Sequence, residues 1–181
     1  MKRVKEGALE FVFPHKETQV LKFDDSNFYR NHLQKASPQR RGADILCLMP
    51  DQALWLIEIK DYRLDAVEQD RSTLPSVIVD KVLDTLAGLC CAKSMNCDEA
   101  EFASQALKIN KVCVVAHVEG LGRLKDDSKH LRKTQTAQGF AADIQVMLRK
   151  KFSKVGLSVK VASLEKPLNG CPWTVRSLPF K

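Results

Sequence analysis

Residues 41–62, with the sequence RGADILCLMPDQALWLIEIKDY, contain two apolar segments separated by a short polar one. The segments Ala43–Met49 and Leu54–Lys60 are nearly continuous hydrophobic runs, which is typical of strands in a sheet covered on both faces. The intervening Pro50–Gln52 favours a turn. The sequence therefore predicts a buried β-hairpin at the centre of the fold.

Three ionisable residues interrupt these apolar strands: Asp44 in the first, and Glu58 and Lys60 in the second. Charged side chains in a buried strand are unfavourable unless they pair or bind a metal. Glu58 and Lys60 are two residues apart, so they point to the same face. If the turn contains an odd number of residues and is centred on Asp51 or Gln52, Asp44 lies opposite Glu58 or Lys60. We therefore expect the three side chains to converge at one place on the sheet.

The alternation of the second strand also divides its apolar residues between two faces. Leu54 and Leu56 are expected on the face that carries the charged cluster. The opposite face is predicted to carry Trp55, Ile57 and Ile59. A slip of one residue in the register would separate Asp44 from the cluster.

Asp44 followed by Glu58-Ile59-Lys60 resembles the motif of the PD-(D/E)xK nuclease superfamily, to which many restriction endonucleases belong. In that motif an Asp on one strand is followed, after a short turn, by Asp/Glu-x-Lys on the next. The resemblance implies that Asp44, Glu58 and the main-chain carbonyl of Ile59 bind Mg²⁺, with Mn²⁺ as a substitute. It also implies that Lys60 is the catalytic cation. Carboxylates are ligands that Mg²⁺ prefers, and a bound metal activates water and stabilises phosphate charge.

The spacing alone has a simpler explanation, because short motifs of this kind also occur by chance. In that case the hairpin is half-exposed, and Glu58 and Lys60 are simply solvated. The apolar strands, the tight turn and the helices expected on either side of the hairpin favour the nuclease interpretation.

Many members of this superfamily place a further carboxylate on the helix before the hairpin. The helix expected here, residues 26–35 (SNFYRNHLQK), contains no acidic residue. The resemblance implies that Asp24 or Asp25 at its start, or Glu10 in the preceding strand, takes this role. For the two aspartates, capping of the helix is at least as good an explanation.

Two residues of the same helix are further candidates for the site. Tyr29 and Arg30 could contact a phosphate group of the substrate. The alternative is that Tyr29 packs in the core and Arg30 is solvated.

The remaining chain supplies the elements of an α/β fold. We expect a second helix from Pro75, with an apolar stripe that includes Val82, Leu83 and Cys90. Its other stripe holds Asp80, Lys81, Asp84 and Thr85, and this stripe either faces solvent, which we favour, or contributes to the site. The other predicted segments are a hairpin of Gly7–Phe13 with Gln19–Phe23, a strand Lys111–His117, a helix Thr136–Phe152, a strand Leu157–Val161 and an irregular tail Pro172–Lys181.

This order of elements predicts an α/β fold of the restriction-endonuclease type, with a central mixed β-sheet flanked by helices. At 181 residues the chain fits one domain, residues 1–181. The sequence shows no apolar run of membrane-spanning length and no apolar core of a signal peptide, so we expect a cytoplasmic protein that does not bind membranes. The six cysteines include no CxxC motif, and buried free thiols are expected.

The net charge of +7 is distributed unevenly along the chain. Residues 1–41 carry +4 and residues 121–181 carry +9, whereas residues 42–120 carry −6. An acidic centre that binds metal between basic segments that bind phosphate suits a nucleic-acid enzyme. A basic protein with no such function would show the same total.

The function predicted from the sequence is a metal-dependent nuclease that hydrolyses phosphodiester bonds in nucleic acid, and we expect DNA rather than RNA as its substrate. One alternative is a non-catalytic nucleic-acid-binding or scaffold module that retains the fold. Another is an unrelated α/β enzyme or regulatory domain with incidental charges in the hairpin. Cutting both strands of a duplex requires two sites, which favours a homodimer or a partner protein.

Overall fold

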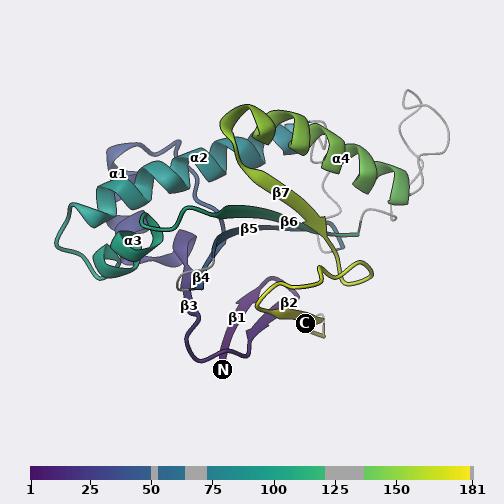
Figure 1. The fold of residues 1–181 in the computed structure, drawn as a ribbon, viewed down its shortest axis with the longest axis horizontal. Coiled ribbons are helices and arrows are strands. Elements are labelled where there is room, and N and C mark those ends of the chain that lie inside the picture. Colours follow the sequence, from purple (N-terminus) through teal and green to yellow (C-terminus); the bar gives the residue numbers. More distant parts are fainter. Residues whose placement is uncertain (50–52, 64–72, 121–136, 180–181) are drawn as a thin grey trace.

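The computed structural model describes residues 1–49, 53–63, 73–120 and 137–179 of the chain. These residues form two β-sheets and several helices (Figure 1), so the predicted α/β class is confirmed. The larger sheet has the strand order β3 (Gln19–Lys22), β4 (Ile45–Met49), β5 (Ala53–Asp61), β6 (Val112–Glu119), β7 (Ser158–Ala162). The smaller sheet has the order β1 (Lys2–Glu6), β2 (Leu9–Phe13), β8 (Thr174–Ser177).

The larger sheet is mixed, as predicted. Strand β4 is antiparallel to both of its neighbours, β3 and β5, whereas β5, β6 and β7 run parallel to one another. The pairing of Met49 with Ala53 and of Ile45 with Ile57 confirms the hairpin and centres its register on position 51. The turn Pro50–Gln52 itself lies outside the described residues.

The helices vary widely in length: α1 (Gln34–Ala36), α2 (Leu74–Lys93), α3 (Ala100–Ala106) and α4 (Ala137–Phe152), with short 3₁₀ turns at Phe23–Asp25 and Ser153–Val155. Before α1 the chain is already helical from residue 27, and its segment Tyr29–Leu33 is π-helical. The Ser26 hydroxyl accepts the Tyr29 N–H at 3.2 Å, so Ser26 caps this helix. The cap expected at Thr136 for α4 falls outside the described residues. No described helix has both the length and the apolar character needed to cross a membrane.

Two hydrophobic cores cover the two faces of the larger sheet. Leu54 and Leu56 of β5 belong to the core beneath the helices, whereas Trp55 and Ile57 belong to the core that includes strand β2 and Trp173. Figure 1 shows α2 and α4 along one side of the sheet and the small sheet on the other. The predicted division of β5 between two faces is therefore confirmed, although a second sheet rather than helices covers the far face.

The pairing predicted for the N-terminal strands is wrong. Strand β2 pairs with β1 and β8, and β3 pairs with β4 in the larger sheet. Leu9, Phe11 and Phe13 are all fully buried, because β2 lays this apolar side on the larger sheet. The tail is also not irregular: Val175 of β8 pairs with Phe11, which gives this short strand its partner.

The buried stripe of α2 is rotated from the predicted one. Leu83 is 42% exposed and Cys90 is exposed, whereas Thr85 and Gly88 are buried. A Cβ at Gly88 would lie 3.1 Å from the ring of Phe23, so glycine allows α2 to pack closely on the N-terminal segment. The expectation of buried cysteines consequently fails in this helix.

Candidate active site

The start of β4 and the end of β5 bring the two predicted carboxylates together. The pairing of Ile45 with Ile57 places Asp44, the residue before Ile45, beside Glu58, the residue after Ile57. Asp44 lies immediately before β4 and is buried, and Glu58 is only 1% exposed. The expected convergence of these side chains is thus confirmed, and of the two residues that the sequence left open opposite Asp44, Glu58 and Lys60, the structure selects Glu58.

The carboxylate of Asp44 has a different partner on each oxygen. Oδ2 accepts the main-chain N–H of Ile59 at 2.6 Å, and Oδ1 lies 2.9 Å from the Nζ of Lys81. Within a strand the N–H and C=O of one residue point to the same side, so the Ile59 carbonyl also points past the start of β4. The structure therefore places Asp44, Glu58 and the Ile59 main chain in one cluster.

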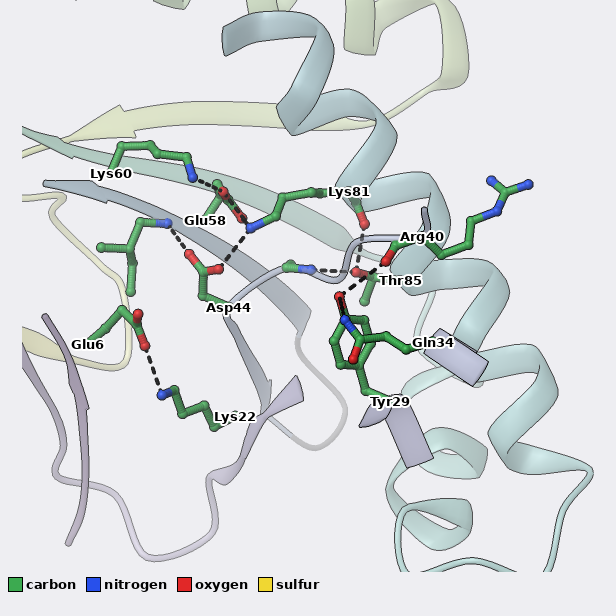
Figure 2. A network of polar contacts seen from close by, with 12 residues as sticks. Glu6, Lys22, Tyr29, Gln34, Arg40, Asp44, Glu58, Lys60, Lys81 and Thr85 are labelled. Carbon is green, nitrogen blue, oxygen red and sulfur yellow. Dashed lines mark hydrogen bonds and ion pairs between the residues drawn. The ribbon is translucent and has the colours of Figure 1, made fainter. Parts of the chain in front are cut away.

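Glu58 is held by two lysines. Lys81 Nζ lies 2.7 Å from both carboxylate oxygens, and Lys60 Nζ lies 3.1 Å from Oε1 (Figure 2). Lys60 is 28% exposed, whereas Lys81 is 12% exposed and bridges Glu58 to Asp44. Lys60 is therefore the cation on the solvent side of the cluster, and Lys81 is the cation between the carboxylates.

A second buried polar contact, made by Thr85, joins α2 to the sheet close to Lys81. One turn further along, the Thr85 hydroxyl donates to the Lys81 carbonyl at 2.7 Å and accepts the Ala43 N–H at 2.8 Å. Thr85 thus joins α2 to the residue that precedes Asp44. The expectation that this stripe faces solvent is wrong for Lys81 and Thr85, and it holds for Asp80.

The sequence did contain an indication of this contact. Ile78 and Val82 are fully buried, and Lys81 lies three residues after Ile78 and four before Thr85. Residues at these spacings share one side of a helix. A lysine beside the buried stripe of the helix that follows the motif is therefore a candidate partner for buried carboxylates.

The buried position of Glu58 changes its acid–base behaviour. Burial, reinforced by the negative charge of Asp44, raises the pKa of Glu58 to about 7, although Lys81 and Lys60 oppose the shift. Burial alone would lower the pKa of Lys81, but the charges of Glu58 and Asp44 outweigh burial and raise it. Lys81 accordingly remains an ammonium group at neutral pH, and Glu58 ionises near neutrality.

Asp24 is a third carboxylate close to this cluster. Burial raises the pKa of Asp24 to about 6, and the negative charges of Asp44 and Glu6 add to the shift. Its Oδ1 atom is buried and has no hydrogen-bond partner within the described part of the chain. Of the additional residues considered from the sequence, Asp24 is the one that the structure places near Asp44.

The other additional residues have partners elsewhere. Asp25 forms ion pairs with Lys22, at 2.7 Å, and with Arg30, which is exposed. Glu10 is buried and accepts a hydrogen bond from Arg176 of β8 at 2.6 Å. The structure does not bring Asp25, Glu10 or Arg30 into the cluster.

Tyr29 packs in the core rather than at a substrate surface. It is only 6% exposed, and its ring lies 5.6 Å from that of Phe23. Its hydroxyl donates to the Arg40 carbonyl at 3.2 Å and accepts from the Gln34 amide at 3.3 Å (Figure 2). The core interpretation of Tyr29 is therefore confirmed, and phosphate contact by Tyr29 is not supported.

A groove opens beside the cluster on the solvent side of α2. It has a volume of about 510 Å³, and its lining includes Arg41, Asp80, Lys81 and Asp84. Asp84 also accepts hydrogen bonds from the Arg40 side chain at 2.5 Å and from the Arg41 N–H at 3.2 Å. Lys81 thus contacts both the buried carboxylates and the groove.

Oxygen atoms of the kind that Mg²⁺ prefers as ligands lie close together in this cluster. Two carboxylates meet at one point, a main-chain carbonyl faces the same side, and the unpartnered Asp24 oxygen is nearby. Among the described residues, no group of three or more His, Cys, Asp or Glu side chains is close enough to hold a metal. A divalent cation at this place would have Asp44, Glu58 and the Ile59 carbonyl as its protein ligands, and water or phosphate would have to complete an octahedron.

The chain is similar to part of a known protein. No family model matches the chain, and no solved structure matches it. The chain is 30% identical over 150 residues to cysteine–tRNA ligase of Neisseria meningitidis serogroup A / serotype 4A (strain DSM 15465 / Z2491). The match covers 66% of this chain and 21% of that protein, so the chain spans about a fifth of the length of this curated relative.

Proposed function

We propose that the protein is a metal-dependent nuclease that hydrolyses phosphodiester bonds in nucleic acid, DNA in preference to RNA. The observation that carries the proposal is that the carboxylates of Asp44 and Glu58 converge on one point, which the Lys81 ammonium now occupies at 2.7–2.9 Å from their oxygens. Lys60 lies beside them. Buried carboxylates in this arrangement require positive charge, and Mg²⁺ or Mn²⁺ supplies it in a nuclease.

Each residue of the cluster has a distinct role in this proposal. When bound, the metal lowers the pKa of a water molecule and polarises the phosphate. Asp44, Glu58 and the Ile59 carbonyl provide its protein ligands. Lys60, the more exposed of the two lysines, extends toward solvent and neutralises the charge that develops on the phosphate oxygens.

The surroundings suit a polyanionic substrate. The groove beside the cluster is lined by Arg41 and Lys81 together with Asp80 and Asp84, and the exposed Arg40 next to it pairs with Asp84, so Arg41 is the basic residue of the groove that is best placed to meet a phosphate. The excess of basic residues before position 42 and after position 120 adds a long-range attraction. A cytoplasmic enzyme acting on duplexes would work as a homodimer or with a partner protein, because two strands need two active sites.

The second candidate is a nucleic-acid-binding or scaffold module without catalysis. One observation favours it: the Lys81 ammonium lies where both carboxylates converge. An internal ion pair of this kind satisfies the carboxylates without any metal. Such a module would retain the groove and its arginines and would bind nucleic acid with strong salt dependence.

The test is cleavage of single- and double-stranded DNA and RNA with Mg²⁺, Mn²⁺ or EDTA. Transfer RNA belongs among the substrates, because the name of the matched relative refers to tRNA. Lys60→Ala should lower metal-dependent cleavage on the order of 10²–10³-fold, because it removes transition-state stabilisation. Lys93→Ala, at an exposed position in the last turn of α2, is the matched control and should cleave normally.

Three outcomes separate the candidates. Metal-dependent cleavage that Lys60→Ala abolishes supports the nuclease. Salt-sensitive binding without cleavage supports the binding module. Cleavage by Lys60→Ala at the wild-type rate contradicts the assignment of Lys60.

A further inference from the structure

The position of Lys81 conflicts with simple metal binding. Its Nζ lies 2.9 Å from Asp44 Oδ1 and 2.7 Å from both oxygens of Glu58. A divalent cation held by the same two carboxylates would need the same oxygen atoms at shorter distances. The ammonium and the metal therefore cannot occupy this point together.

The charge of the cluster leads to the same conclusion. With Lys60 and Lys81 protonated and with Asp44 and Glu58 ionised, the four side chains are neutral in sum. Adding a divalent cation without moving a lysine would leave these four side chains with an excess of two positive charges at a buried place, and an ionised Asp24 nearby would offset only one of them. Uncompensated like charges at a buried site are strongly unfavourable, so one ammonium has to move away.

The groove beside α2 provides a place for Lys81 to move. Its volume is about 510 Å³, and Asp80 and Asp84 line it together with Lys81 itself. The lysine side chain is a flexible four-carbon chain that can turn while α2 stays in place. The Thr85 hydroxyl joins α2 to the sheet by accepting the Ala43 N–H at 2.8 Å, so the side chain of Lys81 can move while the helix keeps its place.

We propose that Lys81 is a positioning residue that serves as the internal cation of the metal-free site and is displaced toward the groove when a divalent cation binds. The inference rests on the proposed metal-dependent function and adds a determinant of metal affinity to it. Lys81 keeps the two carboxylates in place, and the metal has to compete with it. The wild-type protein accordingly binds divalent cations more weakly than its carboxylates alone would allow.

The first experiment measures Mn²⁺ affinity directly by calorimetry at fixed pH. Lys81→Met keeps the length of the side chain and removes its charge, so the dissociation constant for Mn²⁺ should fall on the order of tenfold or more. Lys93→Met on the same helix is the matched control and should bind Mn²⁺ like the wild type. Adding Glu58→Gln to Lys81→Met should abolish the gain, because Glu58 is a ligand in the proposal.

A second experiment uses only the wild-type protein, since Lys81→Met leaves the buried Asp44 without its cation and Glu58 with Lys60 alone, which puts folding of the variant at risk. Acetylation of lysines by an N-hydroxysuccinimide ester is followed by mass spectrometry with and without Mn²⁺. Lys81, ion-paired and 12% exposed, should react slowly without metal and severalfold faster with it. Lys93 should react equally in both conditions.

The outcomes distinguish this inference from the nuclease proposal. Equal or weaker Mn²⁺ binding by a folded Lys81→Met variant overturns the inference, as does an unchanged acetylation rate at Lys81. Absence of Mn²⁺ binding in every variant also overturns it. Tighter Mn²⁺ binding by Lys81→Met without any nucleic-acid cleavage would support the displacement of Lys81 while contradicting nuclease activity.

Discussion

The two faces of β5 differ in what they require from the rest of the molecule. On one face Ile57 is completely buried among apolar side chains, and packing alone satisfies it. On the other face Glu58 is equally inaccessible but depends on Lys81, which lies 23 residues further along the chain. The two faces of β5 therefore have different roles. Substitution of Ile57 on the apolar face should alter folding, and substitution of Glu58 on the ionic face should alter ion binding.

The largest effect is expected on the apolar face. Ile57→Ala should lower the free energy of unfolding by about 2–5 kcal/mol, because it leaves a cavity in a packed core. Denaturant unfolding would measure this loss. Mn²⁺ affinity should remain that of the wild type wherever the variant is folded.

The control for Ile57→Ala is Val146→Ala at a position that is 63% exposed on α4, where the change should stay within about 0.5 kcal/mol. A loss of Mn²⁺ binding in folded Ile57→Ala would show that the two faces of β5 are coupled, and it would contradict the separate roles assigned to them.

A smaller effect is expected where the ionic face is joined to α2. Thr85→Val keeps the shape of the side chain but removes the acceptor of the Ala43 N–H. The unpaired buried N–H should cost about 1–3 kcal/mol in thermal or denaturant unfolding. Ser76→Ala, at an exposed position of α2, is the control. A neutral result would mean that Thr85 does not hold the helix to the sheet.

Asp24, which lies near the ionic face of β5, should make the stability of the protein depend on pH. Its pKa, about 6 in the folded protein, is above the ordinary value of 3.8, so its contribution to stability is complete below pH 4 and is lost as pH rises through 6. Asn cannot ionise and avoids this loss. After allowance for screening by solvent, Asp24→Asn should be more stable than the wild type by about 1 kcal/mol at pH 8 and equal to it at pH 3.5.

Asp25→Asn is the matched control, because Asp25 is exposed and paired with Lys22 and Arg30. It should change stability by less than about 1 kcal/mol. If Asp24→Asn shows the same pH profile as the wild type, Asp24 does not share the buried environment of Asp44.

The smallest perturbation is chemical labelling of thiols. Burial raises the pKa of Cys47, on the apolar side of β4, to about 12, whereas Cys90 and Cys91 are exposed on α2. Because the thiolate is the reactive form, a disulfide reagent should modify Cys90 and Cys91 quickly and Cys47 only after unfolding. Rapid modification of Cys47 in the native protein would show that the apolar face opens readily.

Local alternation was enough to predict the central part of the structure. The turn and the strict period of two in β5 placed Asp44 opposite either Glu58 or Lys60, and the observed register decides for Glu58. The shared face of Glu58 and Lys60 followed from the same period. These features depend on neighbours within about twenty residues, where strand geometry leaves little freedom.

Contacts between distant segments were not predictable in the same way. Lys81 meets Glu58 because α2 packs on the sheet at one rotation, which Gly88 and the ring of Phe23 help to set. Strand β8 is four residues long, and its pairing with β2 is what makes it a strand. The sequence around each of these elements does not contain the partner that determines it.

Strand β4 begins only after Asp44, and this makes the amide of Ile59 a reporter of the Asp44 side chain. Because β4 begins at Ile45, no main-chain carbonyl of β4 reaches this amide, and a carboxylate oxygen of Asp44 accepts its hydrogen at 2.6 Å instead. Exchange of this one hydrogen with deuterium therefore follows the position of a side chain, whereas exchange elsewhere in β5 follows the opening of the sheet. Any ligand that draws Asp44 away should be visible at a single amide while the rest of the strand remains protected.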